Sequence, residues 1–486
     1  MKAKGFKDIE FGMAAAENEC AYKPDLLIDG FLDAYGYIND LINGYKFLVL
    51  GPKGSGKSAI GYKIELLSDN KELFVQTCSL EDFPYNSFSG LIPGGEAPEI
   101  KYPSHWELLL LIALSQSFLR DKECISTGNV DIKRLATQFR DLGIISGKSI
   151  LSDIVKTTTK NEFKIELPKI LTYAHSSEKQ MDNTNIKQLL SSLQEAVFSI
   201  KNSAKHFIII DGLDRVLTKR EGQYKSLTAL IYEADQINNK FRKNGVKAKV
   251  ILLCRSDLFE KLSGPDLNKI KRDMGLTLNW YQTTKDIKKT NLVKLLNLRA
   301  KNSLDLPEID IFEAFMPEYV TTGKPTTKHI FDFTRRTPRD IIQLLNEIQK
   351  QTKGTTPKIE DIEDGLDSYS KEHFTKEIRD ELAGYLEYWE IELSFKLLGK
   401  LSSYRFTYQM LDKKKNGDDE FKDLDLKKIL RLLYECGAIG FVRMKSSQSK
   451  IIWKFLANEY VTFNPDKDDD MVIHRGLRGA LDLRWQ

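Results

Sequence analysis

The chain has 486 residues and a mass of 55.7 kDa, so we expect two to four domains and exclude a peptide or a single small module. Apolar residues make up 41%, charged residues 29%, and the mean hydropathy is -0.37, which is typical of an ordered globular protein and excludes a disordered one. Lys and Arg number 73 against 69 Asp and Glu, and this net charge of +4 is too small to attract nucleic acid or anionic lipid without a local basic patch.

The cysteines and the apolar stretches indicate where the protein works. The five cysteines include no C-x-x-C pair and have no histidine beside them at metal-ligand spacing, so we expect reduced, mostly buried thiols. Residues 1–20 interrupt their apolar positions with Lys, Asp and Glu and lack the apolar core of a signal peptide. The longest apolar stretch, residues 108–114, is far shorter than the roughly 20 residues of a membrane-spanning helix. These features predict a cytoplasmic protein that makes no membrane contact.

Short apolar runs that alternate with helical patterns predict the first part of the fold. The runs cover residues 45–50, 73–77, 206–210 and 249–254, and helical spacing follows the first of them over residues 57–67. Strands that alternate with helices form a parallel sheet covered on both faces, so we expect an α/β fold. Residues 120–204 are polar apart from an amphipathic pattern at 185–200, and we predict a mostly helical insertion there.

The pattern changes after residue 280, which indicates a domain boundary. Residues 275–280 alternate as a fifth strand, and helical patterns follow to about residue 350. Further along, a predicted helix at 424–436 precedes two strands at 438–444 and 451–456, which is the outline of a winged helix. The acidic run 466–470 indicates a solvated loop. Residues 474–485 predict a short amphipathic helix that packs on the winged helix, and the alternative is that Trp485 anchors a partner.

A phosphate-binding motif stands between the first predicted strand and the first predicted helix. Residues 51–58, GPKGSGKS, match the full G-x-x-x-x-G-K-[ST] pattern. Glycines let backbone N–H groups curl around a polyphosphate, and the following helix adds the positive end of its dipole. Lys57 is expected to reach the β and γ phosphates, and Ser58 to ligate magnesium. The predicted nucleotide-binding residues of this loop are Gly51, Pro52, Lys53, Gly54, Ser55, Gly56, Lys57, Ser58 and Ala59.

A phosphate loop needs a carboxylate from a second strand, because the magnesium must be held and the attacking water polarised. Residues 207–214, FIIIDGLD, provide it. Asp211 stands at the carboxyl end of the predicted strand, facing the loop, so we predict that Ser58 and Asp211 are the metal residues. Asp214 is the nearest candidate to orient the hydrolytic water, and the alternative is that it forms a turn or caps a helix.

The segment FIIIDGLDRV resembles the Walker B segment of the STAND class of signal-transducing NTPases and of the origin-recognition branch of AAA+ ATPases. This resemblance places Arg255, in KVILLCRSD, where those families carry a sensor of the γ-phosphate; the alternative is a salt-bridging surface arginine. Residues 332–348, DFTRRTPRDIIQLLNEI, resemble their sensor 2 region, which implies that Arg336 and Arg339 reach the nucleotide; the alternative is a plain helix cap. Arg272 stands where oligomeric members carry an arginine finger.

Bacterial proteins of this build, some of them found in anti-phage defence loci, combine segments that here read AENE, GPKGSGKSA, DGLD and TPRD. The resemblance covers residues 29–350 and the winged-helix tail. It implies an α/β P-loop NTPase of the ASCE type, AAA+-like, with an N-terminal segment at 1–44, an ATPase core at 45–282, a helical lid at 283–355 and a winged-helix domain at 356–486. One departure is the absence of a Glu directly after Asp211, so hydrolysis is expected to be slow or partner-stimulated.

The motifs and the resemblance together predict an ATP-hydrolysing regulatory ATPase with ATP and Mg²⁺ as cofactors. We expect a nucleotide switch in a signalling or anti-phage defence complex that forms a homo-oligomer, acts with a separate effector protein, or both. No nuclease, protease or NADase motif is visible in the chain itself. The alternative is an origin-recognition-like DNA-binding ATPase in replication, partition or transposition, and a third option is a nucleotide-binding scaffold that hardly hydrolyses ATP. The predicted catalytic residues are Lys57, Asp211, Asp214 and Arg255.

The charge of the predicted winged helix bears on DNA as a possible partner. Its helix carries Lys427, Lys428 and Arg431, but Asp423 and Asp425 stand beside them. Phosphate-driven binding needs several cationic contacts, and mixed charge weakens it. Packing against another domain or docking of a protein partner is therefore the favoured interpretation, with DNA binding as the alternative.

Overall fold

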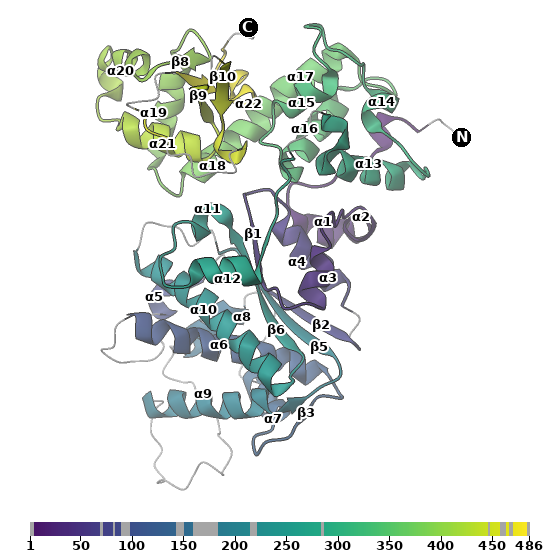
Figure 1. Cartoon of the computed structure of the whole chain (residues 1–486), viewed down its shortest axis with the longest axis vertical. Coiled ribbons are helices and arrows are strands. Elements are labelled where there is room, and N and C mark those ends of the chain that lie inside the picture. The colour runs from purple at the N-terminus through teal and green to yellow at the C-terminus, as the bar shows by residue number, and fades with distance from the viewer. Residues whose placement is uncertain are drawn as a thin grey trace. The chain divides into compact units, whose positions relative to one another are not determined.

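The computed structural model describes residues 4–68, 71–80, 83–88, 98–141, 150–158, 183–213, 221–282, 286–445, 448–456, 463–465 and 470–483. The chain forms two compact units (Figure 1). The sheet unit consists of Asp33–Pro52 and Gly56–Leu278. The helical unit consists of Met1–Leu32, Lys53–Ser55 and Asn279–Gln486.

The sheet unit is built on five parallel strands. They are β1 (Leu48–Gly51), β2 (Leu73–Ser79), β5 (Lys205–Asp211), β6 (Ala248–Arg255) and β7 (Gly275–Thr277), in the order β2-β5-β6-β1-β7. One strand, β6, therefore lies between the strand that precedes the phosphate motif and the strand that ends at Asp211. The apolar runs of β1 and β5 are buried almost throughout, as strands covered on both faces require.

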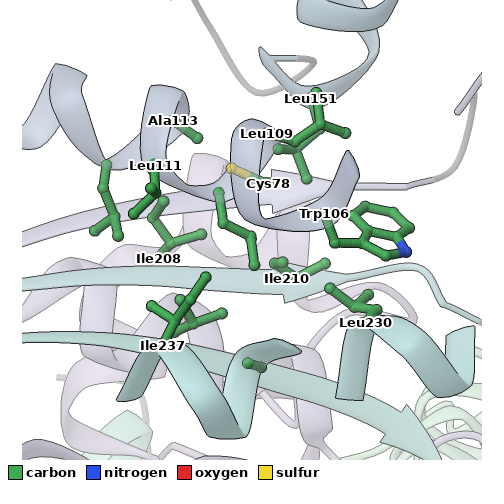
Figure 2. Close-up of a cluster of buried hydrophobic side chains, with 14 of the residues drawn as sticks. Cys78, Trp106, Leu109, Leu111, Ala113, Leu151, Ile208, Ile210, Leu230 and Ile237 are labelled. Carbon is green, nitrogen blue, oxygen red and sulfur yellow. The ribbon is translucent and has the colours of Figure 1, made fainter. Parts of the chain in front are cut away.

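Helices cover both faces of this sheet. Helix α6 (Pro98–Arg120) and helix α10 (Glu221–Asn244) pack with the face that carries Ile208 and Ile210, and Figure 2 shows their apolar side chains around Cys78 of β2. Helix α4 (Lys57–Leu66) covers the other face, where Gly61 lies so close to Ile209 and Leu253 that an added Cβ would be 3.1 Å from the leucine. The run of residues 108–114 is a buried part of α6.

The insertion between β2 and β5 is mostly helical in its described parts. It contains α7 (Ile132–Asp141), α8 (Ile150–Thr158) and α9 (Asn183–Phe198), together with an antiparallel pair, β3 (Ile125–Ser126) and β4 (Ile200–Lys201), that the sequence does not predict. The remaining elements of the sheet unit are α3 (Tyr37–Ile42), α5 (Tyr85–Phe88), α11 (Ser256–Phe259) and α12 (Leu267–Met274).

The helical unit begins with N-terminal helices and continues with the chain after β7. Its first part contains η1 (Phe6–Asp8), α1 (Ala16–Tyr22), α2 (Pro24–Asp29), η3 (Ile287–Lys289), α13 (Asn291–Leu304), α14 (Ile311–Phe315), α15 (Thr326–Phe331), α16 (Pro338–Gln351), α17 (Ile359–Tyr369), η4 (Ser370–Phe374) and α18 (Thr375–Leu382). At the start of α16, Pro338 occupies the first helical turn and the Thr337 hydroxyl accepts a hydrogen bond from the N–H of Asp340.

The C-terminal part of this unit combines helices with a small antiparallel sheet. It contains α19 (Tyr388–Gly399), β8 (Arg405–Phe406), α20 (Tyr408–Asn416), η5 (Asp419–Phe421), α21 (Leu426–Glu435), β9 (Ile439–Lys445), β10 (Gln448–Ile452), η6 (Lys454–Leu456), β11 (Met471–Ile473) and α22 (Arg475–Arg478). The strand order is β10-β9-β11-β8, and one apolar cluster joins both parts of the unit. The helix before the predicted hairpin is present, but β8 and β11 extend the hairpin into a four-stranded sheet.

Two expectations, the fifth strand and the C-terminal helix, need correction. The fifth strand ends at Thr277 and not at residue 280, because the Trp280 indole instead donates a hydrogen bond to a loop carbonyl described below. The C-terminal helix has only four residues, since β11 takes up the chain just before it, and Trp485 lies outside the described residues.

All five cysteines are free thiols, and three of them are buried. No helix in the described ranges is long and apolar enough to span a membrane.

Candidate nucleotide-binding site

The phosphate motif forms the turn between β1 and α4. Gly54 and Gly56 have φ values of +76° and +94°, the left-handed region that glycine adopts without strain. Nothing lies within 4 Å of where a Cβ of Gly56 would stand, so backbone conformation, not crowding, favours glycine there. The Lys57 ammonium donates hydrogen bonds to the carbonyl oxygens of Gly51 (3.1 Å) and Pro52 (3.0 Å). A lysine folded back onto its own loop is positioned for an anion that the loop surrounds.

Asp211 lies at the sheet edge where β1 also ends. Gly51 pairs with Arg255, and Asp211 pairs with Ser79, so the carboxyl ends of these parallel strands meet at one edge. One carboxylate oxygen of Asp211 accepts a hydrogen bond from the N–H of Gly212 at 2.8 Å. Ser58 is half-buried as the second residue of α4. Asp214, expected to orient the water, lies outside the described residues.

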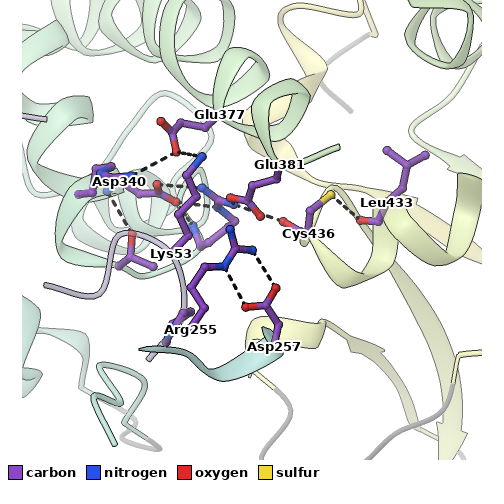
Figure 3. Close-up of polar contacts among 12 residues, drawn as sticks. Lys53, Arg255, Asp257, Asp340, Glu377, Glu381, Leu433 and Cys436 are labelled. Atoms are coloured by element: carbon purple, nitrogen blue, oxygen red, sulfur yellow. Dashed lines mark hydrogen bonds and ion pairs between the residues drawn. The ribbon is translucent and has the colours of Figure 1, made fainter. Parts of the chain in front are cut away.

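Arg255 is held by a neighbouring acid that the sequence analysis passed over. Its Nε and Nη2 atoms donate to the two carboxylate oxygens of Asp257 at 3.0 and 2.8 Å, and only 12% of the arginine side chain is exposed (Figure 3). Burial would raise the pKa of Asp257, but the charge and hydrogen bonds of Arg255, with smaller contributions from Lys261 and Lys57, hold it below its usual value. The signal was available, because Asp257 follows Arg255 by two residues in the first turn of α11.

The tip of the loop, Lys53–Ser55, belongs to the helical unit and contacts the start of α16. The N–H of Arg339 donates to the carbonyl oxygen of Gly54 at 3.3 Å. An added Cβ at Gly54 would lie 3.1 Å from the Arg339 side chain and 3.2 Å from the Thr337 hydroxyl. On the other side, the Trp280 indole N–H donates to the carbonyl oxygen of Ser55 at 2.7 Å. The tip is therefore fixed from two directions by segments that follow β7.

The two arginines of the predicted sensor 2 region lie differently. The Nε of Arg339 donates to the carbonyl oxygen of Ala14 at 2.9 Å, while its Nη1 lies 3.5 Å from a carboxylate oxygen of Glu377. Arg336 has φ +57° and pairs with Asp332 at 3.7 Å, and its guanidinium lies over the ring of Tyr281. The structure thus brings Arg339, and not Arg336, to the tip of the loop.

A test of whether the loop fits a nucleotide comes from Ser55. Its side chain is fully buried, and its Oγ has no hydrogen-bond partner among the residues that the structure describes. A buried hydroxyl without a partner costs free energy, so such a group at the centre of a glycine-rich loop indicates a ligand. Together with the left-handed glycines and the N-terminus of α4, this fits a polyphosphate with Ser58 and Asp211 as the residues that would hold its magnesium.

Arg335 forms a buried network that the sequence analysis did not anticipate. Its Nε lies 3.1 Å from one oxygen of Asp340, its Nη1 donates to Glu381 of α18 at 2.6 Å, and the same Nη1 lies 3.4 Å from the carbonyl oxygen of Cys436 (Figure 3). All three charged side chains are at most 8% exposed. Arg335 thereby ties the start of α16 to α18 and to the turn between α21 and β9. Only its position beside the two predicted arginines hinted at such a role.

The AENE segment has a structural role at its second acid. Glu19 is buried and accepts hydrogen bonds from Arg299 of α13 at 2.6 and 3.1 Å. The same guanidinium donates to the carbonyl oxygens of Phe11 and Gly30. One buried ion pair thus fastens the N-terminal segment to the helices after β7.

A Ser–His–Asp arrangement in the sheet unit has a structural role. His206 contacts the Ser117 hydroxyl through Nδ1 at 2.8 Å and Asp121 through Nε2 at 3.1 Å, and all three residues are buried. Burial lowers the pKa of His206 to about 4, against the opposing effect of Asp121, so the ring is neutral. His206 lies at the beginning of β5, the end opposite Asp211.

Arg272, the candidate arginine finger, is exposed on α12.

The parallel sheet, the glycine-rich loop between β1 and α4 and the acid at the end of β5 define an α/β protein of the P-loop NTPase class. Residues 290–376, from α13 to the start of α18, match a family described as the FunZ-associated C-terminal helical domain. No curated protein matches the chain. Among solved structures, the chain is similar to the ORC1 protein of Aeropyrum pernix, solved in complex with DNA, with 11% identity over 90% of this chain and 93% of that chain and a TM-score of 0.38.

Proposed function

We propose that the protein is an ATP-binding and hydrolysing regulatory ATPase, a nucleotide switch that works with a separate effector in a signalling or anti-phage defence complex. One observation carries the ATPase part of this proposal. The loop of residues 51–58 lies between a buried strand and a helix, and Asp211 ends a parallel strand at the same edge of the sheet. That combination brings phosphate-binding groups and a magnesium-side carboxylate to one edge.

The proposed roles follow the motifs. Residues 51–59 bind the phosphates, with Lys57 on the terminal ones. Ser58 and Asp211 hold magnesium, which when bound neutralises charge on the phosphates, and Asp214 orients the water. Arg255 senses the γ-phosphate. Arg339, which contacts the tip of the loop, is proposed to act on the nucleotide phosphates from there. Arg336, in the same turn, is proposed as the second arginine that reaches the nucleotide.

Two features support a switch over a fast enzyme. Gly212 follows Asp211 where a faster enzyme of the resembled families carries Glu, so the water has no carboxylate directly beside the metal-side acid. Arg255 is paired with Asp257, and this ion pair offsets part of the positive charge that the guanidinium would offer a phosphate. Both features favour slow or partner-stimulated turnover.

A route for the signal exists within the helical unit. The loop tip contacts the start of α16, and Arg335, four residues before Arg339, links this start to α18 and to the Cys436 carbonyl. We propose that nucleotide-dependent movement of the tip reaches the C-terminal sheet along this path. The proposed division remains an N-terminal segment at 1–44, a core at 45–282, a lid at 283–355 and a winged-helix domain at 356–486, in a cytoplasmic homo-oligomer.

The second candidate, an origin-recognition-like DNA-binding ATPase, is favoured by one local feature. Arg443 of β9 stands directly opposite Lys450 of β10, both side chains are exposed, and no ion pair joins either to an acid in the described parts of the chain. Like charges opposite each other destabilise a hairpin, so an anion such as a DNA phosphate would relieve their repulsion. On α21, by contrast, Lys428 is paired with Glu390 at 2.9 Å.

The experiment measures the MgATP turnover of the full chain with and without duplex DNA, with Lys57→Ala as the blank, and its oligomer size with and without ATP. Slow, Lys57-dependent turnover that DNA leaves unchanged, with an ATP-dependent oligomer, supports the switch. Strong stimulation by DNA would favour the second candidate. Equal turnover in the blank would exclude both.

A further inference from the structure

Two cations beside the phosphate loop share one carboxylate. The Lys53 ammonium lies 3.1 Å from Oε2 of Glu377, and Nη1 of Arg339 lies 3.5 Å from the same oxygen (Figure 3). The three side chains are 22%, 28% and 18% exposed for Lys53, Arg339 and Glu377, so solvent screens them only in part. All three belong to the helical unit.

Glu377 is well placed to stay ionised. It lies in α18, inside a run that is helical from Ile359 through η4 to Leu382, so side chains and not a helix N-terminus balance its charge. Burial would raise its pKa, but the charges of Lys53 and Arg339, with a weaker contribution from Arg335, hold the pKa below its usual value. The carboxylate therefore presents a full negative charge to the loop tip at neutral pH.

We propose that Glu377 is an internal counter-ion of the phosphate loop, which pairs with Lys53 and Arg339 when no nucleotide is bound and is displaced from them when a polyphosphate arrives. This inference rests on the proposed function and adds a regulatory residue to the same site. A polyphosphate repels the Glu377 carboxylate and competes for the two cations that it holds. The carboxylate thus lowers nucleotide affinity and sets a threshold for loading.

The displacement has a path to the rest of the unit. Helix α18 also carries Glu381, one turn after Glu377, and Glu381 is bonded to Arg335 and so to the turn at Cys436. When Glu377 is released, α18 loses its ion pairs to Lys53 and Arg339. Glu381, one turn later in α18, keeps its bond to Arg335. Nucleotide binding would therefore change how α18 is held.

The test measures the dissociation constant of MgADP by isothermal titration of the full chain, since MgADP avoids hydrolysis during the titration. Glu377→Gln keeps the size of the side chain and removes its charge, and we expect it to bind MgADP about tenfold more tightly than the wild type. Glu372→Gln is the matched control, because Glu372 is an exposed glutamate nearby that pairs with Lys376 in a surface ion pair. It should stay within about twofold of the wild type.

A gain in affinity is an effect that simple loss of folding does not produce. A double-mutant cycle with Lys53→Gln shows whether Glu377 acts through the loop cation, and the gain should then shrink to less than about threefold. Unchanged or weaker binding by Glu377→Gln would overturn the inference, as would an equal gain with and without Lys53. If the wild type itself binds neither MgADP nor MgATP, the proposed function fails, and this inference with it.

Discussion

Replacing Arg335 by methionine should destabilise the helical unit more than any change at the neighbouring arginines. The substitution keeps much of the side-chain volume but leaves the carboxylates of Asp340 and Glu381 buried without their cation. Removal of one partner from a buried ion pair costs about 3–5 kcal/mol. The pKa of Asp340 points the same way: burial would raise it, but the charge and hydrogen bonds of Arg335, with a smaller contribution from His373, lower it from 3.8 to about 2.

The sign of the pH effect follows from that pKa. A depressed carboxyl pKa gives stability that is present above pH 3.8 and is lost as the pH falls toward 2, so the comparison belongs at pH 7. Urea unfolding followed by tryptophan fluorescence reports mainly this unit, because four of the five tryptophans fall within its ranges. Arg336→Met is the control and should cost less than about 1 kcal/mol, since Arg336 makes one long, partly exposed ion pair with Asp332 and a contact with the Tyr281 ring. A loss below about 1 kcal/mol in Arg335→Met would refute the reasoning.

Three further predictions concern the metal, the N-terminal segment and a core acid. Asp211→Asn should lower MgATP turnover on the order of 100-fold, and wild-type rates would contradict its metal role. Glu19→Gln should leave Arg299 buried without a counter-charge and increase hydrogen exchange of residues 11–19, whereas unchanged exchange would show that the pair does not fasten the segment. Burial, and then the charge of Glu107, raise the pKa of Glu233 to about 8. The free energy of unfolding should therefore fall as the pH rises from 4.5 to 8, by up to about 1.4 kcal/mol per pH unit. Glu233→Gln should remove this slope in thermal unfolding, and an unchanged slope would assign it to another group.

The sheet was predictable because its signals are local. Buried parallel strands have continuous apolar sequences. Each end of β2, β5 and β6 therefore falls within two residues of the end of its predicted apolar run. The short strands β8 and β11 were not predicted, because two or three residues are too few to show an alternating apolar pattern. Their pairing partners come close to them only in the folded chain. The fifth strand was overextended because the alternation of Trp280 has another cause, its bond to the loop.

The candidate site also has parts that the sequence predicts and parts that it does not. The loop and Asp211 follow from strand ends, which the motif and the parallel sheet place at one edge. Glu377 and Glu381, the carboxylates of α18 that contact the arginines, do not follow from any spacing. Glu377 meets Lys53 only in the fold, and the choice between Arg339 and Arg336 depends on which backbone contacts Gly54. Asp257, Asp332 and Asp340 differ, since each stands within five residues of its arginine in the sequence.

The most direct test of nucleotide binding at this loop is a titration of the full chain with MgATP, alongside Lys57→Ala. Lys57 donates to the carbonyl oxygens of Gly51 and Pro52, so its replacement removes the ammonium that the loop holds for a phosphate. We predict saturable binding of one nucleotide per chain by the wild type, and a loss of at least about 100-fold in affinity in the variant, from the loss of a charge-assisted contact. Equal affinity of the two proteins, or no binding by either, would contradict the assignment.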